Sequence, residues 1–474
     1  MELPETYLFS IQTEVAPVYL NDLLVFIYQK YIVPFYRSFA NVRQWKIGER
    51  GFLAFTFLDP RGSWHVDVEI AMGTPIEIKM SPSSREVPLA VLNRLKEDLI
   101  ITVQMFEEKI RRTTFYFAWV QNKDVVPEKP QTGRRKILSQ IFLGNMIIFF
   151  AIFLAFSYLV FLIAREYTPI ILVLAQFVIV LFSDKIIMRL GDWTITADNP
   201  SVHILQYHIP EEELEVSHHK YTRELLTQIK KKIYDNTLAL GKSLDQKVIM
   251  AVFSEYGINL KPENLLTKTV NVYAAVKEAV SRLKMPIPKV RIANVIVPNA
   301  AATGPSPRFS LVLITTGLLV QLDQEEILAV IGHEISHLKG RDPLVLFALV
   351  SAEYLLRVYV LWQYIFLFGF LYFLFALGVV FFIAKFFEAR ADLESAIKMG
   401  NPEILATALT KIGYRRIQAE RMTPTRIGRW IGLDPHPPIS FRVERLENLK
   451  EPWKIKHTFI QSIKDCINGF LKEL

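Results

Sequence analysis

The sequence predicts a mostly α-helical, multi-span membrane protein that carries an α+β domain at its N-terminal end. Two observations support this fold class. Hydrophobic residues make up 51% of the 474 residues, and many are concentrated in apolar runs of the length that marks a candidate transmembrane helix. The first quarter of the chain instead contains short runs that alternate apolar and polar residues, as β-strands do, between stretches with helical periodicity.

An α+β domain is expected over residues 1–128. The turn Asp59-Pro60-Arg61-Gly62 separates two alternating runs, as in a pair of neighbouring strands. We expect an amphipathic helix at 17–33, strands at 52–58, 64–71 and 75–80, a helix at 86–112 and a strand at 113–120. The domain contains no cluster of catalytic residue types, so a regulatory, substrate-presenting or assembly role is open. A linker at 122–133, with Pro127 and Pro130, follows it.

The first pair of apolar runs predicts a transmembrane hairpin within residues 129–190. Residues 138–164 contain no charged side chain and are long enough to cross a bilayer core of roughly 30 Å. A second run, of marginal length, covers about 168–188. Only Arg165 to Thr168 lie between the two runs, so the connection is a tight turn.

A second hairpin is expected within residues 343–387. Residues 344–384 are almost wholly apolar and aromatic, and as one helix they would run about 60 Å, twice the thickness of the bilayer core. We therefore expect two spans that turn near Trp362 and Gln363. The alternative is a pair of long helices that project into solvent and support the functional site.

Four spans would leave every long soluble segment on one side of the membrane. The basic run Arg134-Arg135-Lys136 precedes the first span, whereas the short loops on the opposite side offer only Arg165. The excess of positive charge predicts a cell-membrane protein whose soluble parts face the cytoplasm. The single cysteine, Cys466, agrees with a reducing compartment. The opening segment Met1 to Ser10 lacks a basic start and an apolar core, so we expect no cleaved signal peptide.

Residues His333, Glu334 and His337 form a His-Glu-x-x-His motif within a predicted helix. Positions i and i+4 of a helix lie one above the other, so both imidazoles can reach one metal ion, with Glu334 beside them. Asp323 and Glu326 form a capping-box start to this helix. Apolar residues then recur at helical spacing and leave the two histidines on a different face. The pattern indicates a zinc hydrolase.

A catalytic zinc site uses three protein ligands and keeps a fourth position for water. The best third ligand downstream is Glu388, with Asp392 one helical turn further on. Asp392 would accept the free N–H of a ligand histidine and so fix its tautomer. With one Zn²⁺ per chain bound by His333, His337 and Glu388, we expect Glu334 to act as general base on water and to pass the proton to the leaving amine.

Four motifs in one order resemble the HtpX-type membrane zinc metalloproteases, relatives of the CAAX prenyl endopeptidases. They are NAAATG at 299–304, HEISHLKGRD at 333–342, EARAD at 388–392 and HPP at 436–438. The resemblance runs from about residue 135 to 450. Residues 1–130 have no counterpart in it, and Ala301 stands where the family tends to carry an aromatic residue.

The resemblance implies a zincin-like catalytic domain with a small β-sheet, formed by residues 191–342 and 388–474. It implies an endopeptidase that hydrolyses membrane or misfolded proteins, with His436 stabilising the oxyanion and Asn299 holding the substrate backbone. Strands expected at 201–208, 289–295 and 309–315 would supply a sheet edge on which an extended substrate pairs. On residue type alone, a lone histidine such as His436 is more often a surface or capping residue, and Asn299 is equally at home in a turn.

Two other functions compete with this prediction. The first is a catalytically silent membrane scaffold or chaperone that keeps zinc for structure. The second is a channel or transporter that uses Glu353 and Arg357 within the third span, but four spans leave little room for a polar pathway, and an ion pair facing other helices is favoured. The net charge of +8 is spread over the chain, so we expect lipid headgroups and protein substrates as partners, and no nucleic acid. The other histidines match no ligand spacing and are read as structural: His65, His203, His208, His218, His219 and His457.

Overall fold

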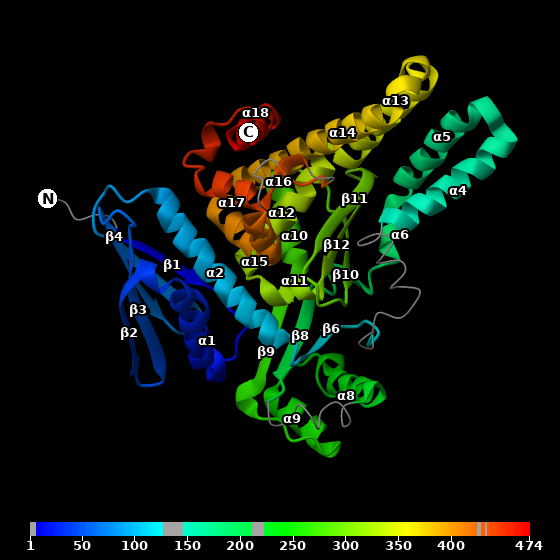
Figure 1. The fold of residues 1–474 in the computed structure, drawn as a ribbon. Coiled ribbons are helices and arrows are strands. Elements are labelled where there is room, and N and C mark those ends of the chain that lie inside the picture. Colours follow the sequence, from blue (N-terminus) through cyan, green and yellow to red (C-terminus); the bar gives the residue numbers. More distant parts are fainter. Residues whose placement is uncertain (1–5, 127–145, 211–221, 424–427, 432–433) are drawn as a thin grey trace.

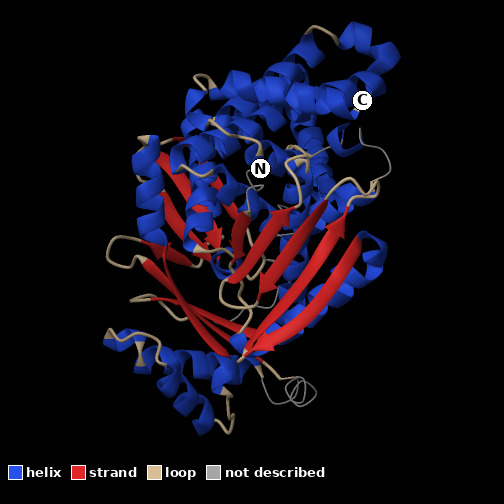
Figure 2. Ribbon diagram, turned by 90° about the vertical axis from the view of Figure 1, so that its left-hand side faces the viewer, coloured by secondary structure: helices blue, strands red, loops and turns tan. Residues whose placement is uncertain are grey.

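The computed structural model describes residues 6–126, 146–210, 222–423, 428–431 and 434–474. The described part is mostly helical, as expected, with three β-sheets. Figure 2 shows the strands grouped through the middle of the molecule, with most of the helices gathered above them.

The N-terminal part contains a five-stranded antiparallel sheet of order β1-β5-β4-β3-β2. Its strands are β1 (Tyr7–Ile11), β2 (Phe39–Ile47), β3 (Arg50–Leu58), β4 (His65–Ala71) and β5 (Ile76–Pro82). In β4, the buried side chains Val66, Val68 and Ile70 alternate with exposed polar ones. Helices α1 (Leu20–Ile27) and α2 (Leu89–Arg111) share one hydrophobic core with this sheet. The expected strands at 52–58, 64–71 and 75–80 and the helix at 86–112 are confirmed; β1 and β2 were not expected.

The helix expected at 17–33 is interrupted. A 3₁₀ turn (Pro17–Tyr19) precedes α1, a π-helical turn (Tyr28–Ile32) follows it, and a 3₁₀ segment (Val33–Ser38) leads into β2. Pro34 lies at the start of that last segment. Because proline lacks a backbone N–H and clashes with the preceding turn, a regular α-helix cannot continue through it.

The strand expected at the end of the N-terminal domain lies in a different sheet. It is β6 (Thr114–Val120), which pairs with β8 (Ser201–His208); β8 pairs in turn with β9 (Leu265–Asn271). Both faces of β6 are covered: Phe117 and Trp119 lie in one core cluster, and Ala118 and Val120 in another. A strand buried on both faces needs neighbours on each side, and the remainder of the chain supplies them.

A four-stranded sheet of order β11-β12-β10-β7 lies next to the helix that bears the histidines. Its strands are β7 (Trp193–Ile195), β10 (Lys289–Ala293), β11 (Ala300–Ser306) and β12 (Phe309–Thr315). β12 runs parallel to β10 and antiparallel to β11, so β11 is an edge strand. The expected strands at 201–208, 289–295 and 309–315 are confirmed, whereas β7, β9 and β11 were not expected.

The other helices surround these sheets (Figure 1). They are α4 (Met146–Ala164), α5 (Thr168–Leu181), α6 (Ser183–Met188), α8 (Arg223–Asn236), α9 (Gln246–Glu255), α10 (Val272–Leu283), α11 (Thr316–Gln321), α12 (Gln324–Gly340), α13 (Asp342–Tyr359), α14 (Trp362–Met399), α15 (Pro402–Met422), α16 (Gly428–Ile431), α17 (Ile439–Glu447) and α18 (Thr458–Glu473). Short 3₁₀ turns lie at Arg165–Tyr167, Leu238–Leu240, Pro262–Asn264 and Pro452–Lys454.

Two helical hairpins, α4–α5 and α13–α14, extend away from the body on the same side (Figure 1). The first turns at Arg165–Tyr167, as expected, and the second breaks at Val360 and Leu361, one residue before the expected turn. The hairpins touch each other: the rings of Phe177 and Phe347 stack with centroids 5.7 Å apart. Within α13, Arg357 and Glu353 form the expected ion pair at 2.9 Å.

Within the described residues, two helical stretches are long and apolar enough to cross a membrane: Ala155–Leu181 and Gly369–Met399. The first of these covers parts of both α4 and α5. The four expected spans are therefore supported only in part. The basic run at 134–136, residues 127–133 of the linker and the start of the first expected span at 138–145 lie outside the described residues.

Candidate metal centre

Helix α12 carries His333, Glu334 and His337 between well-defined ends. The side chain of Asp323 accepts a hydrogen bond from the Glu326 N–H, and the Glu326 carboxylate accepts one from the Asp323 N–H. This is the capping box that the sequence predicted. Three side chains on one face are fully buried: Ile327, Ile331 and Ile335. This buried face packs α12 into the core, and the two histidines, on another face, line a cleft.

Helix α14 brings Glu388 to the two histidines. The Nε2 atoms of His333 and His337 lie 3.2 Å apart. The Glu388 oxygens lie 3.5 Å from Nε2 of His333 and 3.4 Å from Nε2 of His337. Two ligands bound at 2.0–2.1 Å to one tetrahedral ion are separated by about 3.3 Å. Glu388 Oε2 is buried without a hydrogen-bond partner, which is costly unless a cation satisfies it. The three residues therefore fit a single small metal ion.

A carboxylate lies behind each histidine. Asp392 Oδ1 lies 2.9 Å from Nδ1 of His333, and Asp342 Oδ2 lies 2.7 Å from Nδ1 of His337. A carboxylate at Nδ1 keeps the proton on that nitrogen and leaves Nε2 free to bind a metal. The structure thus brings Asp392 to the position that the sequence predicted. Asp342 occupies the matching position behind the other histidine, which the sequence did not predict.

Two arginines hold these carboxylates in place. Arg442 contacts both oxygens of Asp392, at 2.7 and 2.6 Å, and its Nη1 lies 3.5 Å from Glu388. Arg390 donates to Asp342 at 2.7 Å. The glycine at position 340 leaves room for the Arg390 guanidinium, because a Cβ atom there would lie only 2.3 Å from it. Sequence reasoning missed both arginines, although Arg390 lies inside the EARAD motif.

The carboxylates and imidazoles shift one another's pKa. Burial raises the pKa of Asp392, but the charge of Arg442 and the contact with His333 outweigh it and hold that pKa well below its usual value. Glu388 is likewise held well below its usual pKa, against burial, mainly by His337 and His333. Burial lowers the pKa of His333, yet Asp392 and Glu388 together raise it to about 10. The pocket therefore favours positive charge between the ligands.

Glu334 lines the same cleft as the ligands. Burial raises the pKa of its carboxyl group, and the neighbouring histidines and a hydrogen bond from the backbone of Ala302 oppose that rise. A carboxylate with a raised pKa is a better proton acceptor near neutral pH.

His436 and Asn299 lie at the same cleft. His436 Nε2 is 3.6 Å from Glu388 Oε1, and its Nδ1 is 2.9 Å from Asp434. Asn299 precedes β11, where its backbone N–H donates to Thr315 Oγ1 at 2.9 Å, and it is exposed. Asp434 was missed by sequence reasoning, although it lies only two residues before the HPP motif.

The cleft has a volume of about 710 Å³. Its lining includes Asn299 and residues 300–302 of β11, together with Pro435 and His436 of the loop before α17. Much of the remaining lining is apolar: Leu318, Val330, Leu346, Ala384, Phe387, Leu405, Leu409, Ile412 and Ile439. The candidate ligands thus lie beside a largely apolar wall.

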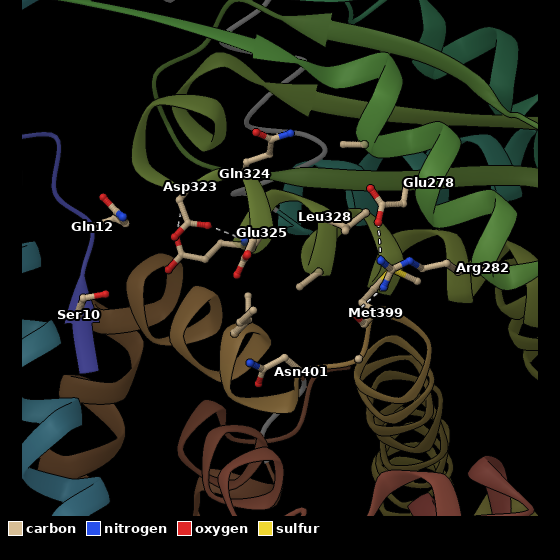
Figure 3. A pocket seen from close by; sticks show the side chains of 15 residues that line it. Ser10, Gln12, Glu278, Arg282, Asp323, Gln324, Glu325, Leu328, Met399 and Asn401 are labelled. Carbon is tan, nitrogen blue, oxygen red and sulfur yellow. Dashed lines mark hydrogen bonds and ion pairs between the residues drawn. The ribbon is translucent and has the colours of Figure 1, made fainter. Parts of the chain in front are cut away.

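The remaining described histidines lie outside this cleft. His208 Nδ1 lies within hydrogen-bonding distance of Thr113 and Thr114, and His203 Nδ1 of Thr269. His218 and His219 lie outside the described residues. A second cavity, of about 860 Å³, opens at the start of α12 (Figure 3), where Arg282 donates to the Met399 carbonyl and to Glu278. It is lined by the opposite end of α12 from the ligands.

Residues 267–450 match the sequence model of peptidase family M48. The chain is 38% identical over 169 residues to a "Protease HtpX homolog" of Methanothermobacter thermautotrophicus, which covers 33% of this chain and 62% of that protein. It is 32% identical to the homologue of Thermococcus kodakarensis, over 38% of this chain and 73% of the relative. It is 30% identical to the homologue of Thermodesulfovibrio yellowstonii, over 44% of this chain and 86% of the relative. The chain belongs to the HtpX-type metalloproteases. No solved structure matches it.

The predicted resemblance is thus confirmed at the level of the family. The family match covers β9 to α17 and contains the HtpX-type motifs at 299–304, 333–342, 388–392 and 436–438. The five-stranded N-terminal sheet precedes the matched residues.

Proposed function

We propose that the chain is a membrane-embedded zinc endopeptidase with His333, His337 and Glu388 as metal ligands. The observation that carries the proposal is the set of three ligand atoms 3.2–3.5 Å apart, with an acidic partner behind each imidazole. Two histidines and one glutamate are a ligand set used by catalytic zinc. Bound zinc polarises a peptide carbonyl and makes water acidic enough to lose a proton near neutral pH.

Glu334 is the proposed general base. Its carboxylate takes a proton from the attacking water and then delivers it to the amide nitrogen as the peptide bond breaks. The neighbouring Ala302 N–H keeps the carboxylate at the cleft. The reaction needs no covalent bond between enzyme and substrate.

His436 is proposed to donate from Nε2 to the oxyanion of the tetrahedral intermediate. Its Nδ1 faces Asp434, which accepts a second hydrogen bond from the backbone N–H of His436. Arg416 pairs with Asp434 at 2.8 Å and so holds the loop. A donor held in place before the reaction stabilises charge that develops later, which is the main electrostatic source of rate enhancement.

The proposed substrates are extended segments of membrane or misfolded proteins. The edge strand β11 lies beside Glu334, and an extended peptide can add to its free edge as a further strand. Asn299, just before β11, would hold the substrate backbone. Ala301 fills little space at the edge, and the apolar wall of the cleft favours cleavage beside apolar residues.

Both hairpins are proposed to cross the membrane, with the metal centre on the cytoplasmic side. Their outer surfaces are rich in apolar side chains that would face water in a soluble protein; Ile163 is 88% and Phe370 73% exposed. Exposed apolar side chains gathered in this way mark contact with lipid or protein. Glu388 follows the second hairpin and His337 precedes it, so the proposed active site lies close to the membrane face.

Metal analysis and cleavage assays with Glu334→Gln test this function. We expect the purified chain to hold about one zinc and to cleave an unfolded membrane-protein substrate, and Glu334→Gln to keep zinc but lose cleavage by roughly 10²–10⁴-fold. Glu325→Gln, an exposed change on the same helix, should behave like the unaltered chain. Equal cleavage by Glu334→Gln would reject the mechanism. Stoichiometric zinc with no cleavage by any form would favour the scaffold or chaperone instead.

A further inference from the structure

The C-terminal helix α18 has two apolar stripes, and only one of them packs on the body. That stripe lies on α14: Phe459, itself 38% exposed, stacks on Phe387 with centroids 5.8 Å apart, and Phe470 contacts Phe382 at 5.6 Å. Cys466 between them is fully buried. These contacts account for the attachment of α18 to the body.

The second stripe consists of Ile460, Ile467 and Leu471, continued by Leu474 just after the helix; these residues are 52%, 40%, 56% and 70% exposed. Their spacing of three, four and seven residues places them on one face of a helix. A row of exposed aliphatic side chains, on a face next to the one that anchors the helix, marks a contact with lipid or with another protein.

Across the described ranges, the acidic residues of α18 are paired with the body, whereas its lysines are not. Its two acidic residues are held in ion pairs with the body: Asp465 with Arg445 at 2.7 Å and Glu473 with Arg429 at 2.6 Å. Lys464 and Lys472 are exposed, and in the described part of the chain no carboxylate pairs with either. The outer surface of α18 is therefore apolar with free positive charge beside it.

The position of α18 along α14 indicates which environment the outer surface of α18 contacts. It packs against Phe382, Lys385, Phe386 and Ala389, where the expected membrane hairpin of residues 343–387 enters the body. Figure 1 shows α18 beside α14. A helix at this level lies where the membrane surface would be if the hairpin spans the bilayer.

We propose that α18 lies on the membrane surface as an amphipathic helix, with its exposed stripe among the lipid chains and its lysines at anionic headgroups. The combination of an aliphatic face with flanking lysines is typical of helices that lie in the interface plane, where lysine stems extend toward the headgroups. This inference rests on the membrane placement proposed above. Because Phe459 stacks on Phe387, the residue before Glu388, the depth of α18 fixes the height of the third ligand above the bilayer.

Site-specific fluorescence of the full-length chain in vesicles tests the proposal. An environment-sensitive thiol probe is attached at Leu471→Cys in α18, at Phe375→Cys in the hairpin or at Ser254→Cys on distant α9. Vesicles contain phosphatidylcholine and phosphatidylglycerol, with or without a nitroxide-labelled lipid as quencher. Native Cys466 stays unlabelled because it is buried and burial raises its pKa to about 12. We expect the quencher to reduce emission at least twofold at 471 and 375, and not at 254.

The three labelled positions distinguish the proposal for α18 from the proposal that the hairpins cross the membrane. Quenching at 375 without quenching at 471 overturns the placement of α18 and leaves the membrane hairpin intact. No quenching at either position rejects the membrane placement and the α18 proposal with it. A disulfide between copies through residue 471, without quenching, identifies a second copy as the occupant and also overturns the proposal.

A charge reversal tests the role of the lysines. Lys464→Glu with Lys472→Glu should reduce quenching at 471 at least twofold in vesicles with phosphatidylglycerol. The matched control Lys242→Glu with Lys247→Glu changes the net charge equally at exposed positions away from α18 and should leave quenching unchanged. Equal effects of the two pairs would show that net charge alone is responsible and would reject the specific contact.

Discussion

Arg442 and Asp392 form a two-point ion pair, with nitrogen–oxygen distances of 2.7 and 2.6 Å, directly behind His333. The pair joins α17 to α14, and Asp392 in turn contacts the imidazole on α12. Three helices thus meet at one chain of charged contacts that ends at a proposed metal ligand.

The geometry of this pair predicts that Arg442→Lys weakens metal binding. Lysine keeps the charge but cannot contact both oxygens at once, so Asp392 and His333 lose their fixed orientation. We expect zinc affinity to fall by roughly 10–100-fold, measured by competition with a chromogenic chelator. Arg282→Lys, an exposed change far from the ligands, serves as control. Unchanged zinc affinity in Arg442→Lys would show that Arg442 only supports the fold.

His436→Ala should lower turnover without releasing the metal. The proposed donor to the oxyanion is lost, and the loss of one such donor typically costs about 10²–10³ in kcat. Asp434→Asn, which weakens the hold on His436, should have a smaller effect in the same direction. Steady-state kinetics with a fluorogenic peptide, together with zinc content, measures both. A raised KM with an unchanged kcat would place His436 in substrate binding instead.

Lys411→Met should destabilise the chain, because it leaves Glu326 buried without its partner. The Lys411 Nζ atom lies 2.7 Å from Glu326 and donates to the Gln12 carbonyl of the N-terminal part. Removal of one member of a buried ion pair typically costs about 3–5 kcal/mol. Denaturant unfolding in detergent measures the loss, and Lys398→Met, at an exposed position, is the control. Glu326→Gln in the Lys411→Met background should recover part of the loss; no recovery would count against the charge argument.

Stability should fall as the pH rises from about 4.5 to 7, in part through Glu14. Burial raises the pKa of Glu14 to about 7, although the charge of Arg111 opposes the rise. Between its ordinary pKa of 4.5 and 7, the folded chain holds a proton that the unfolded chain has released, so stability declines with pH across this window and is level above it.

Thermal unfolding of the unaltered chain and of Glu14→Gln between pH 4.5 and 8 checks this expectation. The variant cannot titrate at this position, so its melting temperature should depend less on pH. Glu49→Gln, at an exposed turn, should retain the full dependence. The same slope in all three proteins would contradict the role of Glu14.

Local interactions explain why part of this protein could be predicted. The capping box of Asp323 and Glu326 depends on residues three apart, and the approach of His333 to His337 depends on residues four apart in one helix. Such spacings are fixed by helix geometry alone. Glu388 and Asp392 were found for the same reason, since the second motif also repeats over one helical turn.

Residues that act across elements were missed. Arg442 lies 50 residues from Asp392, and nothing near Arg442 in the sequence distinguishes it from a surface arginine. Asp342 lies close to His337 but reaches it only because Arg341 adopts a left-handed conformation, with φ at 55°, and turns the chain into α13. β6 was assigned to the N-terminal domain because its partner β8 lies more than 80 residues further on in the chain.

The sequence by itself determined the family, the His-Glu-x-x-His motif on α12, the proposed third ligand on α14 and the apolar hairpin between them, because each depends on residue type and short-range periodicity. Only the tertiary structure decided which carboxylates and arginines hold the histidines, which strand forms the free edge at the cleft, and how α18 lies against α14. Those relationships depend on the packing of distant segments, and no local pattern encodes the distance between two helices.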